Sequence, residues 1–295
     1  MNGSTLSIWV EAIRPKTLIA SIAPVMIGVS LTVSDGVFEF YPSLVTLLAA
    51  VLIQIGTNLA NDYYDFVRGA DNEDRIGPRR VSQAGLISAG KVKRAMTLSL
   101  GMAFLFGIYL VGVGGWVIAV IGLISIVCAV GYTAGPFALA YNGLGDIFVF
   151  SFFEPIAVGG TYWVQAGVFS NDAVLAGVGI GALTTMILVA NNMRDVDNDK
   201  VTGKNTLVVR MGLNFSRVEY VVLLILGLLT PIVGVVRFEW PVSSLLSHLT
   251  LLFAFSPMRV IMHSSDPRVL MSALPSTART VGFYALLLSL GLLVG

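Results

Sequence analysis

Apolar residues gather along the whole chain in segments separated by polar connections. Each segment is close to the ~20 residues that a helix needs to cross a bilayer. The pattern therefore predicts an all-α polytopic membrane protein, in which nine transmembrane helices form a single domain over residues 1–295. The segment at 144–163 is the least regular of the nine, because it contains Gly145 and Pro155. The nine segments are 17–33, 43–60, 95–113, 116–134, 144–163, 173–190, 218–236, 241–258 and 278–295.

The composition excludes the soluble classes of protein. Apolar residues make up 56% of the chain and charged residues 12%, whereas soluble globular domains carry about 25% charged residues. A disordered chain would combine high charge with low hydrophobicity. The single Cys rules out an intrachain disulfide framework and a Cys-clustered zinc site. The two His residues, His248 and His263, are far apart in sequence and give no indication of a His-based metal site.

The basic residues are divided unequally between the two sides of the predicted bundle. Nine spans place the N-terminus and the loops after spans two, four, six and eight on one side. That side receives every one of the 18 Lys and Arg residues except Arg237. Because cytoplasmic loops carry the excess of Lys and Arg, this side is predicted to be cytoplasmic. It also holds the two long polar loops, 61–94 and 191–217, and long loops within a compact domain are usually functional. The expected location is the cell (inner) membrane.

Two acidic motifs stand where predicted spans end on this side. The first, NLANDYYDFVRGAD, covers residues 58–71, and the second, NNMRDVDNDKVTGK, covers 191–204. If each helix continues into its motif, each motif presents one stripe of amide and carboxylate side chains, because residues three, four, seven or eight apart share a helix face. Asp197 falls off its stripe, and the acids beyond Gly69 read as loop charge. The stripes are Asn58, Asp62 and Asp65 in the first motif and Asn191, Asp195 and Asp199 in the second.

Acidic stripes at membrane depth need a compensating charge, because a buried carboxylate there costs several kcal/mol. Hard divalent cations supply it, and Mg²⁺ is typically held by one or two carboxylates together with phosphate oxygens of a substrate. Neighbouring Arg and Lys side chains would then bind the remaining phosphate oxygens. This combination indicates a lipid-linked diphosphate substrate. The competing interpretation, that these acids only solvate helix ends, would suit one stripe better than two matched ones.

Six ordered blocks resemble one family, the UbiA-type intramembrane prenyltransferases, and among them the MenA type, the 1,4-dihydroxy-2-naphthoate polyprenyltransferases. The resemblance implies a nine-helix bundle with a cavity open to the cytoplasmic side. It also implies a reaction in which a polyprenyl group passes from an allylic diphosphate to the naphthoate ring, with loss of CO2 and diphosphate, to give a demethylmenaquinone. The blocks are RPKTL (14–18), NLANDYYDFVRGAD (58–71), RIGPRR (75–80), YTAGPFALAYNGLGD (132–146), GTYWVQAG (160–167) and NNMRDVDNDKVTGKNTLVVRMG (191–212).

The residues and the resemblance together give a set of candidate site residues. Asp62, Asp195 and Tyr132 are the catalytic candidates, Tyr132 because an aromatic face can share the charge of a carbocation. The candidate Mg²⁺ ligands are the six members of the two stripes. The substrate-binding candidates are Arg14, Lys16, Asn61, Arg79, Arg80, Tyr141, Arg194, Lys200 and Lys204.

Two alternative functions stay open at this stage. The same fold could prenylate another acceptor, such as 4-hydroxybenzoate, homogentisate, a chlorophyllide or a glycerol lipid. A secondary transporter also uses internal repeats and broken helices, but its sites lie near the bilayer midplane rather than at helix ends. The expected partners are a polyprenyl diphosphate, an aromatic acceptor and the lipid bilayer. No nucleic-acid partner is expected, and no oligomeric state is predicted.

The orientation can be tested at Ser88, in the first long loop. A cysteine introduced there, in a variant that also carries Cys128→Ala, should be labelled by membrane-impermeant maleimide only after the membrane is opened. The reason is that the loop belongs to the side rich in Lys and Arg. Labelling of the introduced cysteine in intact cells would reverse the orientation.

Overall fold

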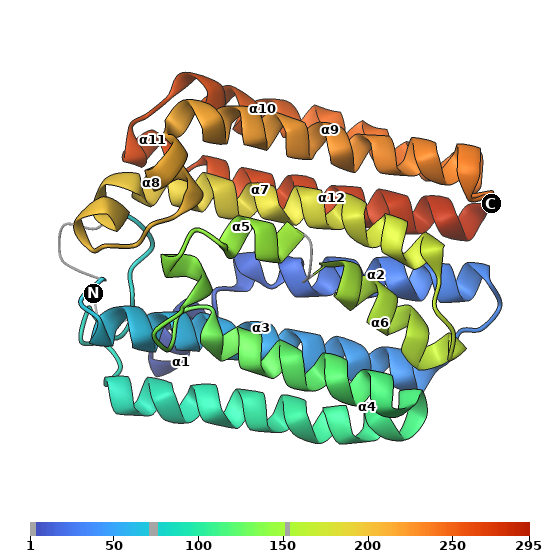
Figure 1. Ribbon diagram of the computed structural model, residues 1–295, viewed down its shortest axis with the longest axis horizontal. Helices are drawn as coiled ribbons and strands as arrows, with labels where there is room; N and C mark the ends of the chain where they lie inside the picture. The colour runs from blue at the N-terminus through green and yellow to red at the C-terminus, as the bar shows by residue number, and fades with distance from the viewer. Residues whose placement is uncertain (1–3, 71–75, 151–153) are drawn as a thin grey trace.

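The computed structural model describes residues 4–70, 76–150 and 154–295, and the regular structure in these ranges is helical. Figure 1 shows long helices lying side by side along one direction. The elements are α1 (Thr5–Ile13), η1 (Pro15–Thr17), α2 (Ile19–Ser34), α3 (Phe40–Val67), α4 (Ala89–Gly131), η2 (Leu139–Tyr141), α5 (Gly145–Phe148), α6 (Glu154–Ala166), α7 (Asn171–Val201), α8 (Leu207–Met211), α9 (Leu213–Arg237), η4 (Val242–Thr250), α10 (Leu251–His263), α11 (Pro267–Leu270) and α12 (Ala273–Val294).

Six helices of the described ranges are long and apolar enough to cross a membrane, and a seventh is added if the bent pair around residue 18 counts as one span. The chain is therefore an all-helical protein with multiple membrane spans. Within α4, Gly115 has a φ of +73°, outside helical geometry, and Figure 1 shows the helix turning back on itself. The two predicted spans 95–113 and 116–134 are the two arms of this hairpin. The count of nine stays a prediction.

The predicted span 144–163 is not one continuous helix. In this region α5 ends at Phe148 and α6 begins at Glu154, and residues 151–153 lie outside the described part of the chain. Pro155 gives a physical reason for the break. Proline lacks the N–H that a helix interior uses and its ring clashes with the preceding turn, so it is best tolerated in the first turn of a helix. Pro155 is the second residue of α6.

The centre of the bundle is α7, which packs against α6, α9 and α12. Its contact with α9 depends on small residues. A Cβ atom added at Gly179 would lie 2.7 Å from the side chain of Thr230, and one added at Gly227 would lie 2.7 Å from Leu183. Small residues at such contacts let helix backbones approach closely in a membrane, where van der Waals packing drives helix association. This packing holds the end of α7, with the second acidic motif, in place.

The close approach of α7 and α9 can be tested at Gly227. Gly227→Ala should destabilise the protein by roughly 1–3 kcal/mol, because the added methyl group overpacks against the fully buried Leu183. Gly101→Ala on α4 is the matched control, since a Cβ there meets no atom within 4 Å and alanine is the better helix former. Thermal unfolding midpoints in one detergent give the comparison. Equal midpoints for the two variants would contradict the packing argument.

Candidate active site

The two acidic motifs lie on helices that continue past their apolar segments. Helix α3 extends to Val67 and α7 extends to Val201, so each motif keeps the helical spacing that aligns its stripe. The four aspartates of the stripes are at most 5% exposed. By contrast, the side chain of Asp197, which falls off its stripe, is 81% exposed. The buried and exposed faces of α7 therefore separate as the spacing requires.

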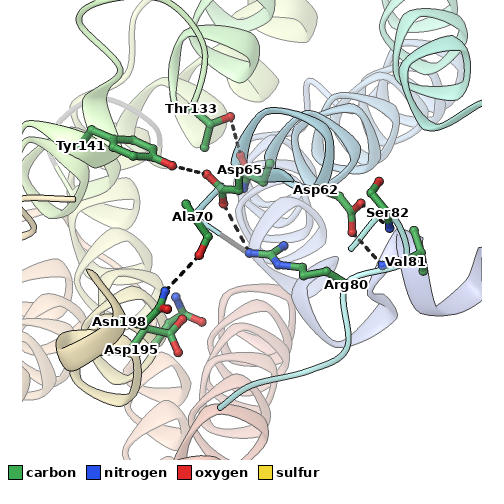
Figure 2. Close-up of polar contacts among 12 residues, drawn as sticks. Asp62, Asp65, Ala70, Arg80, Val81, Ser82, Thr133, Tyr141, Asp195 and Asn198 are labelled. Carbon is green, nitrogen blue, oxygen red and sulfur yellow. Dashed lines mark hydrogen bonds and ion pairs between the residues drawn. The ribbon is translucent and has the colours of Figure 1, made fainter. Parts of the chain in front are cut away.

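A direct contact joins the two motifs. The side-chain amide of Asn198 on α7 donates a hydrogen bond to the backbone carbonyl of Ala70, just after α3, over 3.2 Å. Figure 2 shows this bond beside Asp195, with Asp65 and Arg80 on the opposite side of the same region. Segments more than 120 residues apart in sequence thus meet in one place.

Asp62 anchors the loop that follows the first motif. Its two carboxylate oxygens accept hydrogen bonds from the backbone N–H groups of Val81 and Ser82, each over 3.1 Å. Carboxylates that accept backbone N–H bonds make strong, charge-assisted contacts. Figure 2 shows this fork, which places the adjacent Arg80 toward the interior of the site.

Asp65 lies one turn further along α3 and connects three segments. Its carboxylate accepts a 2.8 Å hydrogen bond from the Tyr141 hydroxyl, and it pairs with the guanidinium of Arg80 over 3.6 Å. The Tyr141 ring also lies beside two cations, with the Arg68 guanidinium 4.6 Å and the Lys204 ammonium 5.7 Å from its centroid. The structure thus brings Tyr141 and Arg80 to Asp65, and Lys204 to the ring of Tyr141. All three are among the predicted substrate-binding residues.

The second motif holds its own counter-ion. The guanidinium of Arg194 donates to both carboxylate oxygens of Asp195, each over 2.7 Å, and also to the side-chain oxygen of Asn191 over 2.8 Å. Arg194 is 3% exposed. A fork-like pair of this kind fixes both side chains, because the planar guanidinium matches the carboxylate at two points. Three predicted site residues therefore form one unit on α7.

Tyr132 lies where charges from both motifs converge. The carboxylates of Asp146, Asp65 and Asp199 are near enough to interact electrostatically with its hydroxyl group. A small cavity is lined by Tyr132, Asp146 and Asn192, and the Asn192 amide lies 3.4 Å from both oxygens of Asp146. Neither Asp146 nor Asn192 is among the site residues predicted from the sequence. The sequence does contain a hint of both residues. Asp146 is the last residue of the block YTAGPFALAYNGLGD that resembles the family, and Asn192 follows the predicted ligand Asn191.

Two other predicted residues join neighbouring segments. The amide of Asn58 donates to the carbonyl of Ile13 and to the hydroxyl of Thr17, which holds the segment containing Arg14 against α3. Asn61 accepts a hydrogen bond from Thr133 at the end of α4. Both residues position the elements around the acids.

Three of the predicted substrate-binding residues contact residues other than the acids of the two stripes. Arg79 donates to the carboxylate of Glu11, which raises the pKa of the guanidinium above its ordinary value, first through these hydrogen bonds and then through its charge. Lys200 pairs with the exposed Asp197 over 3.8 Å. Lys16 is exposed and lines a groove beside α12. In these contacts none of the three side chains reaches the acids of the two stripes.

The six predicted metal ligands do not form one preformed cage. The described residues contain no group of three or more His, Cys, Asp or Glu side chains arranged to hold a metal ion. The physical reason is that Asp62 and Asp195 direct both carboxylate oxygens at N–H donors. Mg²⁺ needs only one or two carboxylates when substrate phosphates complete its shell. The carboxylate oxygens of Asp65, which pairs with Arg80, and of the buried Asp199 are donors of the kind that Mg²⁺ binds.

Similarity to known proteins identifies the family of this chain. The model of the UbiA prenyltransferase family matches residues 21–287. The chain belongs to this family. It is 36% identical to a 1,4-dihydroxy-2-naphthoate octaprenyltransferase of Escherichia coli K12, over 96% of the chain and 94% of the relative. It is 34% identical to the enzyme of that name from Haemophilus influenzae, over 100% of the chain and 98% of the relative.

Solved structures show the same fold at low sequence identity. A UbiA homolog from Aeropyrum pernix K1 has a TM-score of 0.66 at 14% identity, covering 93% of this chain and 98% of that one. A UbiA homolog from Archaeoglobus fulgidus, bound to DMAPP and Mg²⁺, has a TM-score of 0.59 at 14% identity, covering 95% and 99%. The family's helical bundle is thus conserved in this chain far beyond sequence similarity.

The buried acids of this family member can be separated from its exposed ones by substitution. Asp65→Asn and Asp199→Asn should each lower prenyl transfer at least ~100-fold, the scale of losing a charge partner for the transition state. Asp197→Asn is the matched control on the exposed face of α7, where a single surface charge contributes little. Turnover of purified variants, together with their unfolding midpoints, measures the effect. Similar losses in all three well-folded variants would mean that these acids only solvate helix ends.

Proposed function

We propose that this protein transfers a polyprenyl group from an allylic polyprenyl diphosphate to 1,4-dihydroxy-2-naphthoate, releasing CO2 and diphosphate and giving the quinol form of demethylmenaquinone. The observation that carries the proposal is full-length similarity to proteins of that activity. Besides the two relatives described above, the 1,4-dihydroxy-2-naphthoate octaprenyltransferase of Bacillus subtilis is 30% identical over 97% of the chain and 92% of its own length. The reaction belongs to menaquinone biosynthesis.

Mg²⁺ is the proposed metal. Homologs from Archaeoglobus fulgidus have been solved with DMAPP and with GPP together with Mg²⁺. In this chain Asp65 and Asp199 would hold the ion, with Asp62 and Asp195 next to them on the same stripes. When bound, Mg²⁺ neutralises the charge that develops on a departing diphosphate.

The cations of the site suit the two anionic parts of the substrates. Arg80 reaches Asp65 from the loop fixed by Asp62, and Lys204 lies beside Tyr141. Arg80 is buried enough, at 12% side-chain exposure, for its charge to act in a medium of low dielectric constant. We assign Arg80 to the diphosphate, because a guanidinium donates to two phosphate oxygens at once. Lys204 is available to the phosphates or to the acceptor carboxylate.

An apolar cavity offers room for the polyprenyl chain. It has a volume of about 450 Å³ and is enclosed by α2, α3, α4 and α6, with Ala49, Gly107 and Gly160 among its lining residues. Ile53 also lines it, and Asn58 follows five residues later on α3, a rise of about 7.5 Å. The cavity therefore leads along α3 toward the first acidic motif, as a substrate with a charged head and an apolar tail requires.

Tyr132 and Tyr141 complete the proposed chemistry. Ionisation of an allylic diphosphate leaves a carbocation, which water would destroy, so a closed apolar site protects it. The face of an aromatic ring attracts a cation, and both tyrosines stand beside the acids at the head of the bundle. The rings would stabilise the carbocation until the electron-rich naphthoate ring attacks it and loses its carboxyl group.

The proposal includes the nine-span topology. Nine spans would place the N-terminus and both acidic motifs on the cytoplasmic side of the cell membrane, with the site open to that side. The two arms of α4 and the pairs η1–α2 and η4–α10 each correspond to segments that the hydrophobic pattern selects. The distribution of Lys and Arg supports this orientation, because cytoplasmic loops carry the excess of basic residues. The anionic groups of the substrates would then lie near these basic loops.

The acceptor and the metal are tested together with purified protein in detergent. Mg²⁺, an allylic polyprenyl diphosphate and carboxyl-labelled 1,4-dihydroxy-2-naphthoate should give a prenylated naphthoquinol and labelled CO2. EDTA should abolish the product and excess Mg²⁺ should restore it, because the buried acids need a cation in order to hold a diphosphate. His248→Asn and His263→Asn should keep this metal dependence.

Parallel reactions with 4-hydroxybenzoate, homogentisate, a chlorophyllide and a glycerol lipid are the controls for the acceptor. A prenylated product from any of these, and none from the naphthoate, would replace the proposed acceptor. Full turnover in EDTA would exclude the metal.

A further inference from the structure

A second hollow, whose lining contains no acidic residue, lies between α2 and α12. This groove of about 410 Å³ runs between the start of α2 and the side of α12, and its volume is in the usual range of ligand sites. We call it the α2–α12 groove. Its lining includes Lys16, Ile19, Ala278, Arg279, Phe283 and Leu286.

The groove is polar at one end and apolar along the rest. Lys16 lies just before α2, and Arg279 lies in the second turn of α12, at the end of the bundle where α3 and α7 also end. Leu286 follows Arg279 by seven residues, about 10 Å further along the helix. An occupant that matches this gradient has a charged head at the membrane surface and an apolar tail that extends toward the membrane interior.

The two cations have no counter-ion of their own. In the ranges that the structure describes, neither Lys16 nor Arg279 makes a hydrogen bond or an ion pair, and both are exposed. A single basic side chain at a helix end can extend into water without a partner. Two such side chains from different helices at the head of one groove form a site of positive charge, and basic pockets between membrane helices bind anionic lipid headgroups.

The walls of the groove are firmly held. The Phe283 ring stacks on Phe253 of α10, with centroids 3.9 Å apart and planes 6° apart. On the floor, a Cβ added at Gly282 would lie 3.4 Å from Ile19, so α2 and α12 are in close contact there. Phe283 and Leu286 are 37% and 43% exposed. The groove is thus a preformed apolar channel that faces the lipid.

We propose that the α2–α12 groove binds an anionic phospholipid, with the headgroup phosphate between Lys16 and Arg279 and one acyl chain along Ile19, Phe283 and Leu286. Charge complementarity selects this occupant. A zwitterionic lipid also has a phosphate, but its ammonium group would be repelled by the same cations. A soluble anion would leave the apolar length of the groove uncovered.

Native mass spectrometry of the full-length protein in detergent tests the site, with phosphatidylglycerol and phosphatidylcholine of equal chain length as probes. The parent protein should retain phosphatidylglycerol in preference to phosphatidylcholine. Lys16→Gln combined with Arg279→Gln should weaken phosphatidylglycerol binding at least about tenfold, since each basic side chain at an anionic surface contributes to the affinity. Arg259→Gln combined with Arg268→Gln is the control. It removes the same charge from exposed residues outside the groove, and its binding should equal that of the parent.

Competition distinguishes the possible sources of the phosphate. Glycerol phosphate should fail to displace the lipid, because it has no chain to fill the groove. Geranylgeranyl diphosphate should not displace it at concentrations that saturate turnover. Equal lipid retention by the two double variants would overturn the proposal. Displacement by glycerol phosphate would reduce the groove to an anion site, and displacement by the prenyl diphosphate would assign it to the substrate; either result overturns a phospholipid site.

Discussion

Burial of carboxylates at the edge of the membrane is the constraint on which the site depends. Each buried acid must have N–H donors or cations, because an unpaired charge in a low-dielectric interior is very costly. Asp62 obtains two backbone N–H groups, Asp65 a hydroxyl and Arg80, and Asp195 the fork of Arg194. Arg194 lies on α7 itself, whereas the partners of Asp62 and Asp65 come from the segment between α3 and α4 and from η2. Asp62 and Asp65 therefore hold the connecting segments in position in addition to being candidate ligand-binding residues.

The same pairs would supply the charges that the proposed reaction needs. A guanidinium that pairs with a carboxylate can pair equally with phosphate oxygens, and a carboxylate that accepts from a guanidinium can ligate Mg²⁺. Arg80 and Asp65 would therefore be able to exchange their mutual contact for contacts to a diphosphate and to Mg²⁺ with charge kept in balance. This explains why the site contains matched acids and bases rather than a cage of acids alone.

Local spacing made part of this structure predictable. The helix period alone aligned Asp62 with Asp65 and separated Asp195 and Asp199 from Asp197, and the hydrophobic pattern located the long helices. Features that depend on tertiary contacts were missed. Asp146 and Asn192 meet only because α5 packs on α7, and Lys16 faces α12, more than 250 residues away in sequence. The break before α6 follows from Pro155, whose effect depends on where in a helix it falls.

Tyr141 shows how these separate contacts become one enclosure. Its hydroxyl bonds to Asp65 on α3, its backbone carbonyl accepts from the N–H of Asn205 after α7, and its ring lies beside Arg68 and Lys204. One residue thus connects the end of α3, the η2 turn and the segment after α7. Such a connection ties the two acidic motifs together at the same end of the bundle. The residues that join the two motifs, Tyr141 and Lys204, are thus also residues that carry polar or charged groups toward the acids, and a diphosphate bound between the motifs would meet them.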